Sequence, residues 1–336
     1  MTLANTVLAL MWLGLTAYAL FAGADFGAGV WDLLAGGTVR GAPQRRLIEH
    51  SIGPVWEANH VWLIFVLVVL WTATPPAFAA VASTLYIPLT LAAFGMIARG
   101  AAFAFRKAVT GERLERFFGA TFAFSSVVTP FFLGAIAGGV ASGRVPPGIA
   151  QGNVITSWLN PTSLLGGVLA VGVCAYLAAV YLCGDAVREG ATGVEAAIRG
   201  RGIISAVAVG VVALAGIAVL RSDAPDLFYG LTHRGLPLIL VSAVAGIASV
   251  VLLVRRRYRP ARLAAALAVT AVVWGWAAGQ YPYVLPPELT IEEAAASRAT
   301  LIAMLVSLLL GSLLLVPSLW YMYALFQRSP VGAHRR

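Results

Sequence analysis

The fold of this chain is decided by residues 51–76, which read SIGPVWEANHVWLIFVLVVLWTATPP. Gly53-Pro54 predicts a helix start, because proline is tolerated where the first amides of a helix have no partner. Every residue from Val61 to Leu70 is apolar, and Pro75-Pro76 ends the run. A continuous apolar run of this kind predicts a helix that crosses a lipid bilayer.

The same stretch carries polar side chains in the first two turns of that predicted helix. Trp56, Glu57, Asn59 and His60 all precede the apolar run. Glu57 and His60 are three residues apart, so they lie on one helical face. A carboxylate, an amide and an imidazole are unusual in a helix that enters lipid, and they are candidate functional groups.

The composition extends the membrane interpretation to the whole chain. Of 336 residues, 60% are hydrophobic and only 11% are charged, whereas soluble domains carry about 25% charged residues. The net charge of +9 comes from short basic clusters between apolar runs, as in membrane loops, so nucleic-acid binding is not expected. The prediction is an all-α integral membrane protein with one polytopic domain, residues 1–336.

The chain contains nine apolar runs long enough to cross a bilayer. They cover residues 5–24, 57–74, 78–98, 117–141, 162–183, 202–220, 235–254, 262–280 and 300–326. With the N-terminus outside, only four basic residues fall on the outer side: Arg144, Arg221, Arg234 and Arg298. The other nineteen of the 23 Lys and Arg residues fall inside, which predicts an outer N-terminus and a cytoplasmic C-terminus.

Three titratable residues are predicted at one depth, near the inner ends of the first three spans. Asp25 and Glu57 are acids, and Arg99 is a base. One interpretation is a proton path, since partly desolvated carboxyl groups can load and release protons at cellular pH. The other is a structural ion pair of Asp25 or Glu57 with Arg99. Residue spacing leaves both open.

The remaining metal-binding residue types favour structural roles. His60 lacks a facing histidine on another span, because His50, His233 and His334 fall in loops or the tail. This favours a packing or proton-relay histidine over a haem ligand. The two cysteines, Cys174 and Cys183, lie on opposite faces of one predicted helix and are expected to be buried. No metal-ligand spacing is present, so no metal site is predicted.

The motif around Glu57 resembles the second subunit of cytochrome bd-type quinol oxidases, the cyanide-insensitive type included. The matching residues are Gly53, Pro54, Trp56, Glu57, Asn59, Val61 and Trp62. Further matches are Gly23, Asp25, Gly27 and Gly29 in the first span, Arg99, Gly100, Phe103 and Arg106 in the third, and the segment 281–286. Two acidic positions of the family pattern are replaced here, by Ala22 and Ala104.

The resemblance implies a subunit of a respiratory quinol:oxygen oxidoreductase in the bacterial cytoplasmic membrane, inactive alone. It implies a haem-bearing subunit I that holds haems b and d and the quinol site, and allows a small single-span subunit. No catalytic residue and no cofactor is then expected in this chain, only contacts with its partners and with membrane lipids. Asp25, Glu57 and His60 become candidates for a cytoplasmic proton path, supported by Trp56, Asn59, Trp62 and Arg99.

A proton-coupled secondary transporter is the alternative, because many spans and intramembrane acids fit both classes. Transporters often carry broken helices in corresponding halves near mid-membrane. Here the polar residues are predicted at the inner ends of N-terminal spans, which favours the oxidase subunit.

Overall fold

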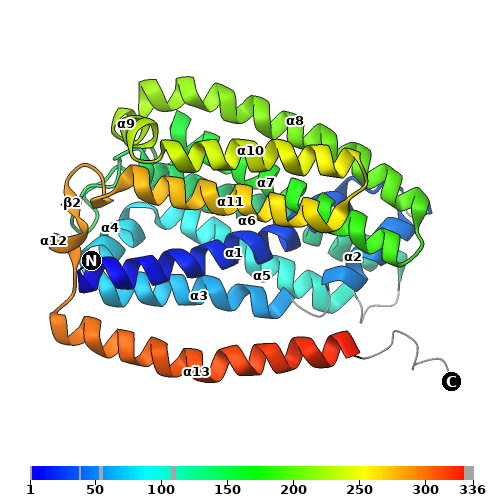
Figure 1. Ribbon diagram of the computed structural model, residues 1–336, viewed down its shortest axis with the longest axis horizontal. Coiled ribbons are helices and arrows are strands. Elements are labelled where there is room, and N and C mark those ends of the chain that lie inside the picture. Colours follow the sequence, from blue (N-terminus) through cyan, green and yellow to red (C-terminus); the bar gives the residue numbers. More distant parts are fainter. Residues whose placement is uncertain (1, 38, 53–55, 107–110, 329–336) are drawn as a thin grey trace.

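Long helices arranged side by side make up the protein (Figure 1). The structure, a computed structural model, describes residues 2–37, 39–52, 56–106 and 111–328. Within these residues, eight helices are long and apolar enough to cross a membrane, or nine if one bent pair counts as a span. The predicted all-α fold with about nine spans is confirmed.

The first half contains α1 (Leu3–Leu33), α2 (Ala42–Ile52), α3 (Trp56–Ala73), α4 (Pro75–Thr84), α5 (Tyr86–Arg106) and α6 (Glu112–Ala141). The second half contains α7 (Pro161–Arg188), α8 (Thr192–Asp223), α9 (Pro225–His233), α10 (Leu236–Val254) and α11 (Tyr258–Gln280). A two-stranded hairpin, β1 (Tyr283–Leu285) with β2 (Leu289–Thr290), then leads through α12 (Ile291–Ala294) to α13 (Arg298–Arg328).

The two halves repeat one order of elements. Apart from α2, which is present only in the first half, each half contains two long helices, then a short helix beginning with proline, and then two more spans. The short helices α4 and α9 start after residues of nearly identical backbone conformation, Thr74 at φ −135°, ψ 63° and Ala224 at φ −139°, ψ 63°. Both lie at the same end of the bundle as the N-terminus, here called the α4 end (Figure 1).

The opposite end, here called the α2 end, carries α2 and the turns that follow α7 and α10 (Figure 1). The segments that carry most of the arginines predicted to be cytoplasmic lie at this end: α2, the turn after α7 and the turn after α10. The arrangement agrees with alternating spans. Which end faces the cytoplasm stays a prediction from the charge bias.

Two span boundaries differ from the sequence prediction. The predicted third span, 78–98, is wrong: α4 is a separate helix, and the axes of the segments Asn59–Ala73 and Pro75–Thr84 differ by 119°. The third span is instead α5, in which Arg99 lies two turns before the end. The first span does not stop at residue 24 but continues to Leu33, so Asp25 lies inside the helix.

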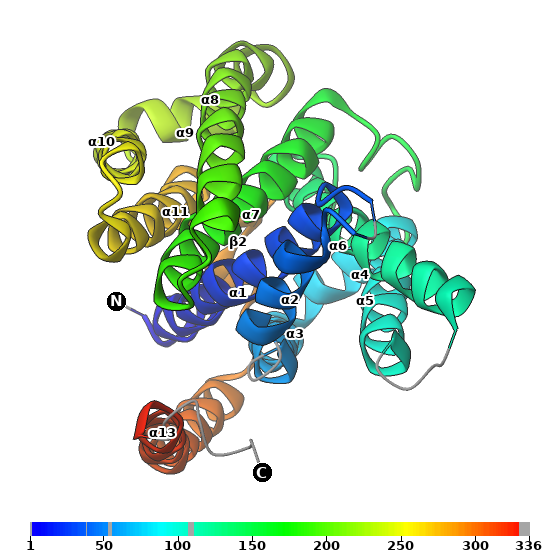
Figure 2. The same ribbon diagram turned by 90° about the vertical axis from the view of Figure 1, so that its right-hand side faces the viewer.

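Helices α1 and α7 pack against each other in the middle of the bundle (Figure 2). A methyl group on Gly27 would lie 1.8 Å from the carbonyl oxygen of Cys174, so the two backbones are in direct contact. Helix α13 lies to one side (Figure 2), and Leu301 in its first turn packs in a cluster with Val7 and Val69. Both cysteines are buried and free, as predicted.

Candidate functional site

The centre of the candidate site is a buried ion pair between α1 and α5. Nη1 and Nη2 of Arg99 donate to Oδ2 and Oδ1 of Asp25 at 3.0 and 2.8 Å. Nη2 also donates to the Asp25 main-chain carbonyl at 3.1 Å. The two side chains are 2% and 3% exposed. Of the two pairings that the sequence left open for Arg99, the structure forms the one with Asp25.

A third helix completes the surroundings of Arg99. Its Nε donates to Oγ of Ser126 on α6 at 2.9 Å, and its guanidinium lies over the rings of Phe26 and Phe122, 5.0 and 4.7 Å from their centroids. Such stacking suits the planar, weakly hydrated guanidinium. Ser126 fits because it faces Gly29: a methyl group there would lie 2.0 Å from its Oγ. The glycine spacing around Asp25 thus makes room for α6 and α7.

Helix α6 is irregular beside this serine. Pro130 lies inside the helix and cannot donate the usual bond to the carbonyl of Ser126, since proline has no amide hydrogen. The Ser126 hydroxyl donates to the carbonyl of Phe122 at 2.7 Å. Ser126 and Pro130 are site residues that sequence reasoning missed. A serine four residues before a proline in an apolar span was the available signal.

His60 lies among aromatic rings, beside the Phe26 ring that also lies against Arg99. Its ring centroid is 6.0 Å from that of Phe26 and 6.5 Å from that of Tyr18. Nδ1 of His60 and the hydroxyl of Tyr18 are both buried without a hydrogen-bond partner among the described residues. Both groups lie within range of the charges on Asp25 and Arg99. Buried polar atoms are normally paired, so these two require an explanation.

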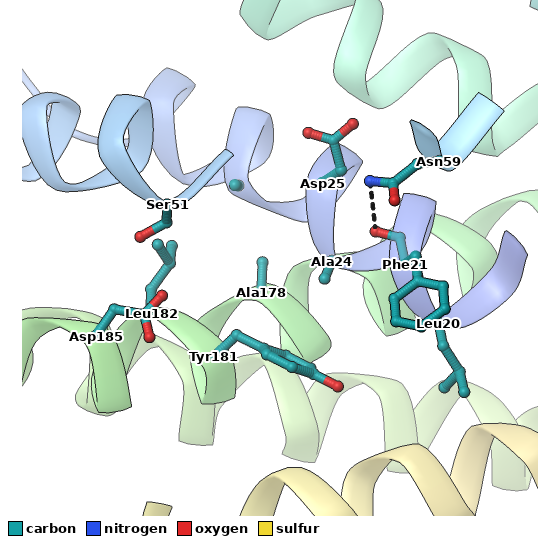
Figure 3. Close-up of a pocket in the computed structure, with 11 residues that line it drawn as sticks. Leu20, Phe21, Ala24, Asp25, Ser51, Asn59, Ala178, Tyr181, Leu182 and Asp185 are labelled. Carbon is teal, nitrogen blue, oxygen red and sulfur yellow. Dashed lines mark hydrogen bonds between the residues drawn. The ribbon is translucent and has the colours of Figure 1, made fainter. Parts of the chain in front are cut away.

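The supporting residues from the family motif have distinct positions. Asn59 is buried and its Nδ2 donates to the carbonyl of Phe21 at 3.4 Å, which ties α3 to α1 (Figure 3). Trp62 packs with Tyr18 and Phe26. Trp56 and Glu57 begin α3, but their side chains lie outside the described part of the structure, so the predicted role of Glu57 stays untested.

The two departures from the family pattern lie in different surroundings. Ala22 is fully buried and packs with Tyr18, Phe26 and Cys174. Ala104 lies on the exposed face of α5. An acid at position 22 would therefore enter the aromatic cluster near His60, whereas one at position 104 would point out of this chain.

A cavity of about 160 Å³ lies between α1 and α7. Figure 3 shows its lining, which includes Asp25, Ser51, Asn59, Tyr181 and Asp185. Ser51 on α2 and Asp185 in the last turn of α7 lie at one side of the lining, and Asp25 and Asn59 lie at the other (Figure 3). The cavity volume is enough for several water molecules. Sequence reasoning missed Asp185 and Tyr181, although an aspartate in the last turn of an apolar span was visible.

Further ion pairs surround the α2 end of the site. Arg45 and Arg106 lie 3.3 and 3.5 Å from the carboxylate of Asp32, which joins α1, α2 and α5. Nη2 of Arg262 lies 2.5 Å from Oδ1 of Asp185, which joins α11 to α7. No group of three or more His, Cys, Asp or Glu side chains is placed to hold a metal ion within the described residues.

These features define a class: a multi-span helical membrane protein with a buried charged site and an adjoining cavity. Comparison with known proteins gives the family. The profile described as "Cytochrome bd terminal oxidase subunit II" matches residues 3–326, and the chain belongs to this family. The resemblance seen in the motifs is confirmed.

Alignments with individual relatives agree with this family assignment. The chain is 31% identical over 155 residues to the cytochrome bd ubiquinol oxidase subunit 2 of Bacillus subtilis, covering 45% of this chain and 44% of that protein. It is 30% identical over 175 residues to the cytochrome bd-I ubiquinol oxidase subunit 2 of Escherichia coli, covering 50% and 45%. These alignments thus span about half the length of the curated relatives.

A solved structure extends the likeness to the whole fold. A chain of the bd oxidase from Geobacillus thermodenitrificans superimposes with a TM-score of 0.73 at 26% identity. The match covers 97% of this chain and 99% of that chain.

Proposed function

We propose that this protein is subunit II of a respiratory quinol oxidase that oxidises quinol and reduces oxygen to water. In this proposal it binds no haem itself, stabilises a haem-bearing subunit I, and helps to deliver protons from the cytoplasm. Haems b and d, the quinol site and the electrogenic chemistry then belong to the assembled complex, which can include a small single-span subunit. The α2 end of the bundle faces the cytoplasm.

The observation that carries the proton role is the placement of the Asp25–Arg99 pair near two buried polar groups without a partner among the described residues, on His60 and Tyr18. Asp25 is buried, is paired with Arg99, and lines a cavity whose lining also includes Ser51 on α2 and Asp185 on α7. Charged side chains inside a membrane protein are costly, usually occur in pairs, and often mark an ion or proton path. The charge of Asp25 is offset by Arg99, which allows the carboxylate to remain at this depth.

The geometry suggests which residues exchange protons and which provide a fixed charge. Arg99 occupies both carboxylate oxygens of Asp25, so little of that carboxylate is free to accept a proton. The pair therefore serves as a fixed electrostatic anchor. His60 and Tyr18 each keep a polar atom free of protein partners among the described residues and are better suited to exchange protons with water. Glu57, three residues before His60, is the candidate donor to them.

A set of variants separates this role from a purely structural ion pair. Replacing the pair by apolar residues of similar size, as in Asp25→Leu/Arg99→Met, is expected to keep the fold, because such exchanges are often neutral or stabilising. We expect full haem content in the complex but quinol oxidase turnover lowered by about tenfold or more, because His60 and Tyr18 lose the neighbouring charges; loss of a proton-transfer group itself would cost about 10²–10⁴-fold. Normal turnover with normal haem content would leave the pair with a structural role only.

Two single variants test the remaining candidates. Glu57→Gln and His60→Phe keep the size of each side chain and remove its titration, so turnover should fall while haem content stays. Trp71→Phe, on the exposed side of α3, is the matched control and should leave turnover unchanged. Purification tests the wider proposal: a transporter would be isolated colourless and without a haem-bearing chain, which would contradict it.

A further inference from the structure

The turn between α10 and α11 carries four arginines within five residues: Arg255, Arg256, Arg257 and Arg259. All four are exposed. Across the described residues, none of their side chains forms an ion pair or hydrogen bond with the protein. This differs from Arg262, one turn further on, whose guanidinium is engaged by Asp185 and the carbonyl of Tyr181. The charge of the turn is therefore directed outward.

The backbone of this turn is fixed. The amide of Arg257 donates to the carbonyl of Leu252 at 2.9 Å, and that of Arg256 to the carbonyl of Leu253 at 3.1 Å. This pair of bonds is the Schellman motif, which closes a helix with a residue in the left-handed conformation. That residue is Arg256, at φ +57°. Glycine is preferred there, so the helix end alone does not explain an arginine.

Apolar surface lies directly next to the arginines. Val254 in the last turn of α10 and Leu263 and Leu267 on α11 are exposed, Leu263 by 74%. Helices α10 and α11 form an outer corner of the bundle, away from α13 (Figure 2). Guanidinium groups above an apolar helix surface match a phospholipid, whose phosphate takes paired N–H donors and whose acyl chains cover the helices.

We propose that this turn is a binding site for an anionic phospholipid. The phosphate of the headgroup binds Arg255, Arg256, Arg257 and Arg259, and the acyl chains lie on α10 and α11. The Schellman motif holds the arginines in one arrangement, which reduces the ordering cost of binding. The proposal does not depend on the direction of the spans or on the proton role of Asp25.

The test uses the protein purified from membranes with its natural partner chain, and native mass spectrometry to count bound phosphatidylglycerol or phosphatidylcholine. The wild type should retain phosphatidylglycerol in preference. The variant Arg255→Gln/Arg257→Gln/Arg259→Gln should bind it roughly tenfold more weakly, since each arginine near anionic lipid contributes appreciably. The control, Arg40→Gln/Arg46→Gln/Arg113→Gln, removes three exposed arginines elsewhere and should change binding less than about twofold.

Equal loss in both triple variants would overturn the site, because it would show a general charge effect. Absence of a phosphatidylglycerol preference in the wild type would do so too, and is the result expected if a partner chain covers the turn. Arg256→Gly separates structure from binding. Glycine suits the left-handed position, so thermal stability should be equal or higher while phosphatidylglycerol binding falls; unchanged lipid binding would contradict the role given to the Arg256 side chain.

Discussion

Arg99 binds Asp25 through both carboxylate oxygens, at 3.0 and 2.8 Å, and also through the Asp25 carbonyl at 3.1 Å. One guanidinium thereby joins the side chain and the backbone of α1 to α5, and its Nε reaches α6. Removing either partner leaves a buried charge uncompensated, which costs far more than the pair contributes when both are present.

Loss of Arg99 alone should therefore be severe. Arg99→Met leaves the Asp25 carboxylate buried without its partner and is expected to destabilise the protein by about 3–5 kcal/mol. The measurement is the apparent melting temperature in detergent, together with the folded yield. Arg188→Met is the control: Arg188 pairs with Asp185 but is 71% exposed, and exposed pairs contribute about 0–1 kcal/mol. Similar losses in both variants would contradict the burial argument.

The contact of α1 with α7 predicts a steric effect. Gly27→Ala places a methyl group 1.8 Å from the carbonyl oxygen of Cys174, where backbone and not a flexible side chain must move. We expect a loss of about 3 kcal/mol or more, at the upper end for overpacked cores. Gly246→Ala on α10 meets no atom within 4 Å and should be neutral or stabilising by up to about 1 kcal/mol. Thermal denaturation of the two variants side by side decides between these outcomes.

Asp223 links the two halves at the α4 end. Its carboxylate accepts bonds from Arg144, at 3.1 and 2.6 Å, and from the amide and hydroxyl of Thr162, at 3.0 and 2.6 Å. Asp223→Asn should weaken these bonds and cost about 1–3 kcal/mol. A double-mutant cycle with Arg144→Gln should give a coupling energy of roughly 0.5–3 kcal/mol. Simple additivity of the two single changes would mean that the pair contributes no joint stability.

The bonds between Thr290 and Glu293, in the segment before α13, predict that the local stability of this segment depends on pH. The side chain and amide of Thr290 donate to Glu293 at 2.7 and 3.0 Å, and these bonds lower the pKa of the Glu293 carboxyl. A lowered pKa means that the stabilisation is present above the unfolded pKa and is lost as pH falls through the folded one. Hydrogen exchange of amides 290–295, corrected for intrinsic rates, should therefore accelerate at acid pH.

Two substitutions at the same position check the origin of that effect. Glu293→Gln can still accept the capping bonds but does not titrate, so the acid-dependent part of the exchange should disappear. Glu293→Ala should exchange rapidly at every pH. Persistence of the same acid dependence in the glutamine variant would assign it to another group.

Sequence reasoning predicted that Asp25 and Arg99 lie at one depth, but it did not identify every residue of the site. Asp25 and Arg99 were predictable as neighbours because both follow long apolar runs. Ser126 was not, because its place beside Arg99 depends on the gap at Gly29, which hydropathy does not encode. Asp25 seemed to mark the end of the first span. Its charge is offset by Arg99, so α1 continues to Leu33.

The misplaced third span has a different cause. Hydropathy reports how apolar a segment is but not its direction, and the segment Pro75–Thr84 is as apolar as a spanning helix. The bend that turns it by 119° depends on the backbone at Thr74, φ −135° and ψ 63°. Nothing in the composition of residues 75–98 indicates that conformation, whereas Pro75 itself correctly predicted the helix end.

The direct contact of Gly27 with Cys174 also limits how the protein can move. A shift of α1 along α7 that brought a larger residue to the place of Gly27 would press its side chain against the carbonyl of Cys174, so sliding of these two helices is sterically opposed. The packed pair of α1 and α7 is expected to be rigid, and Asp25 lies on α1 within this pair. We therefore expect changes in the access to the cavity beside Asp25 to come from rotations of lining side chains such as Tyr181 more than from sliding of α1 against α7.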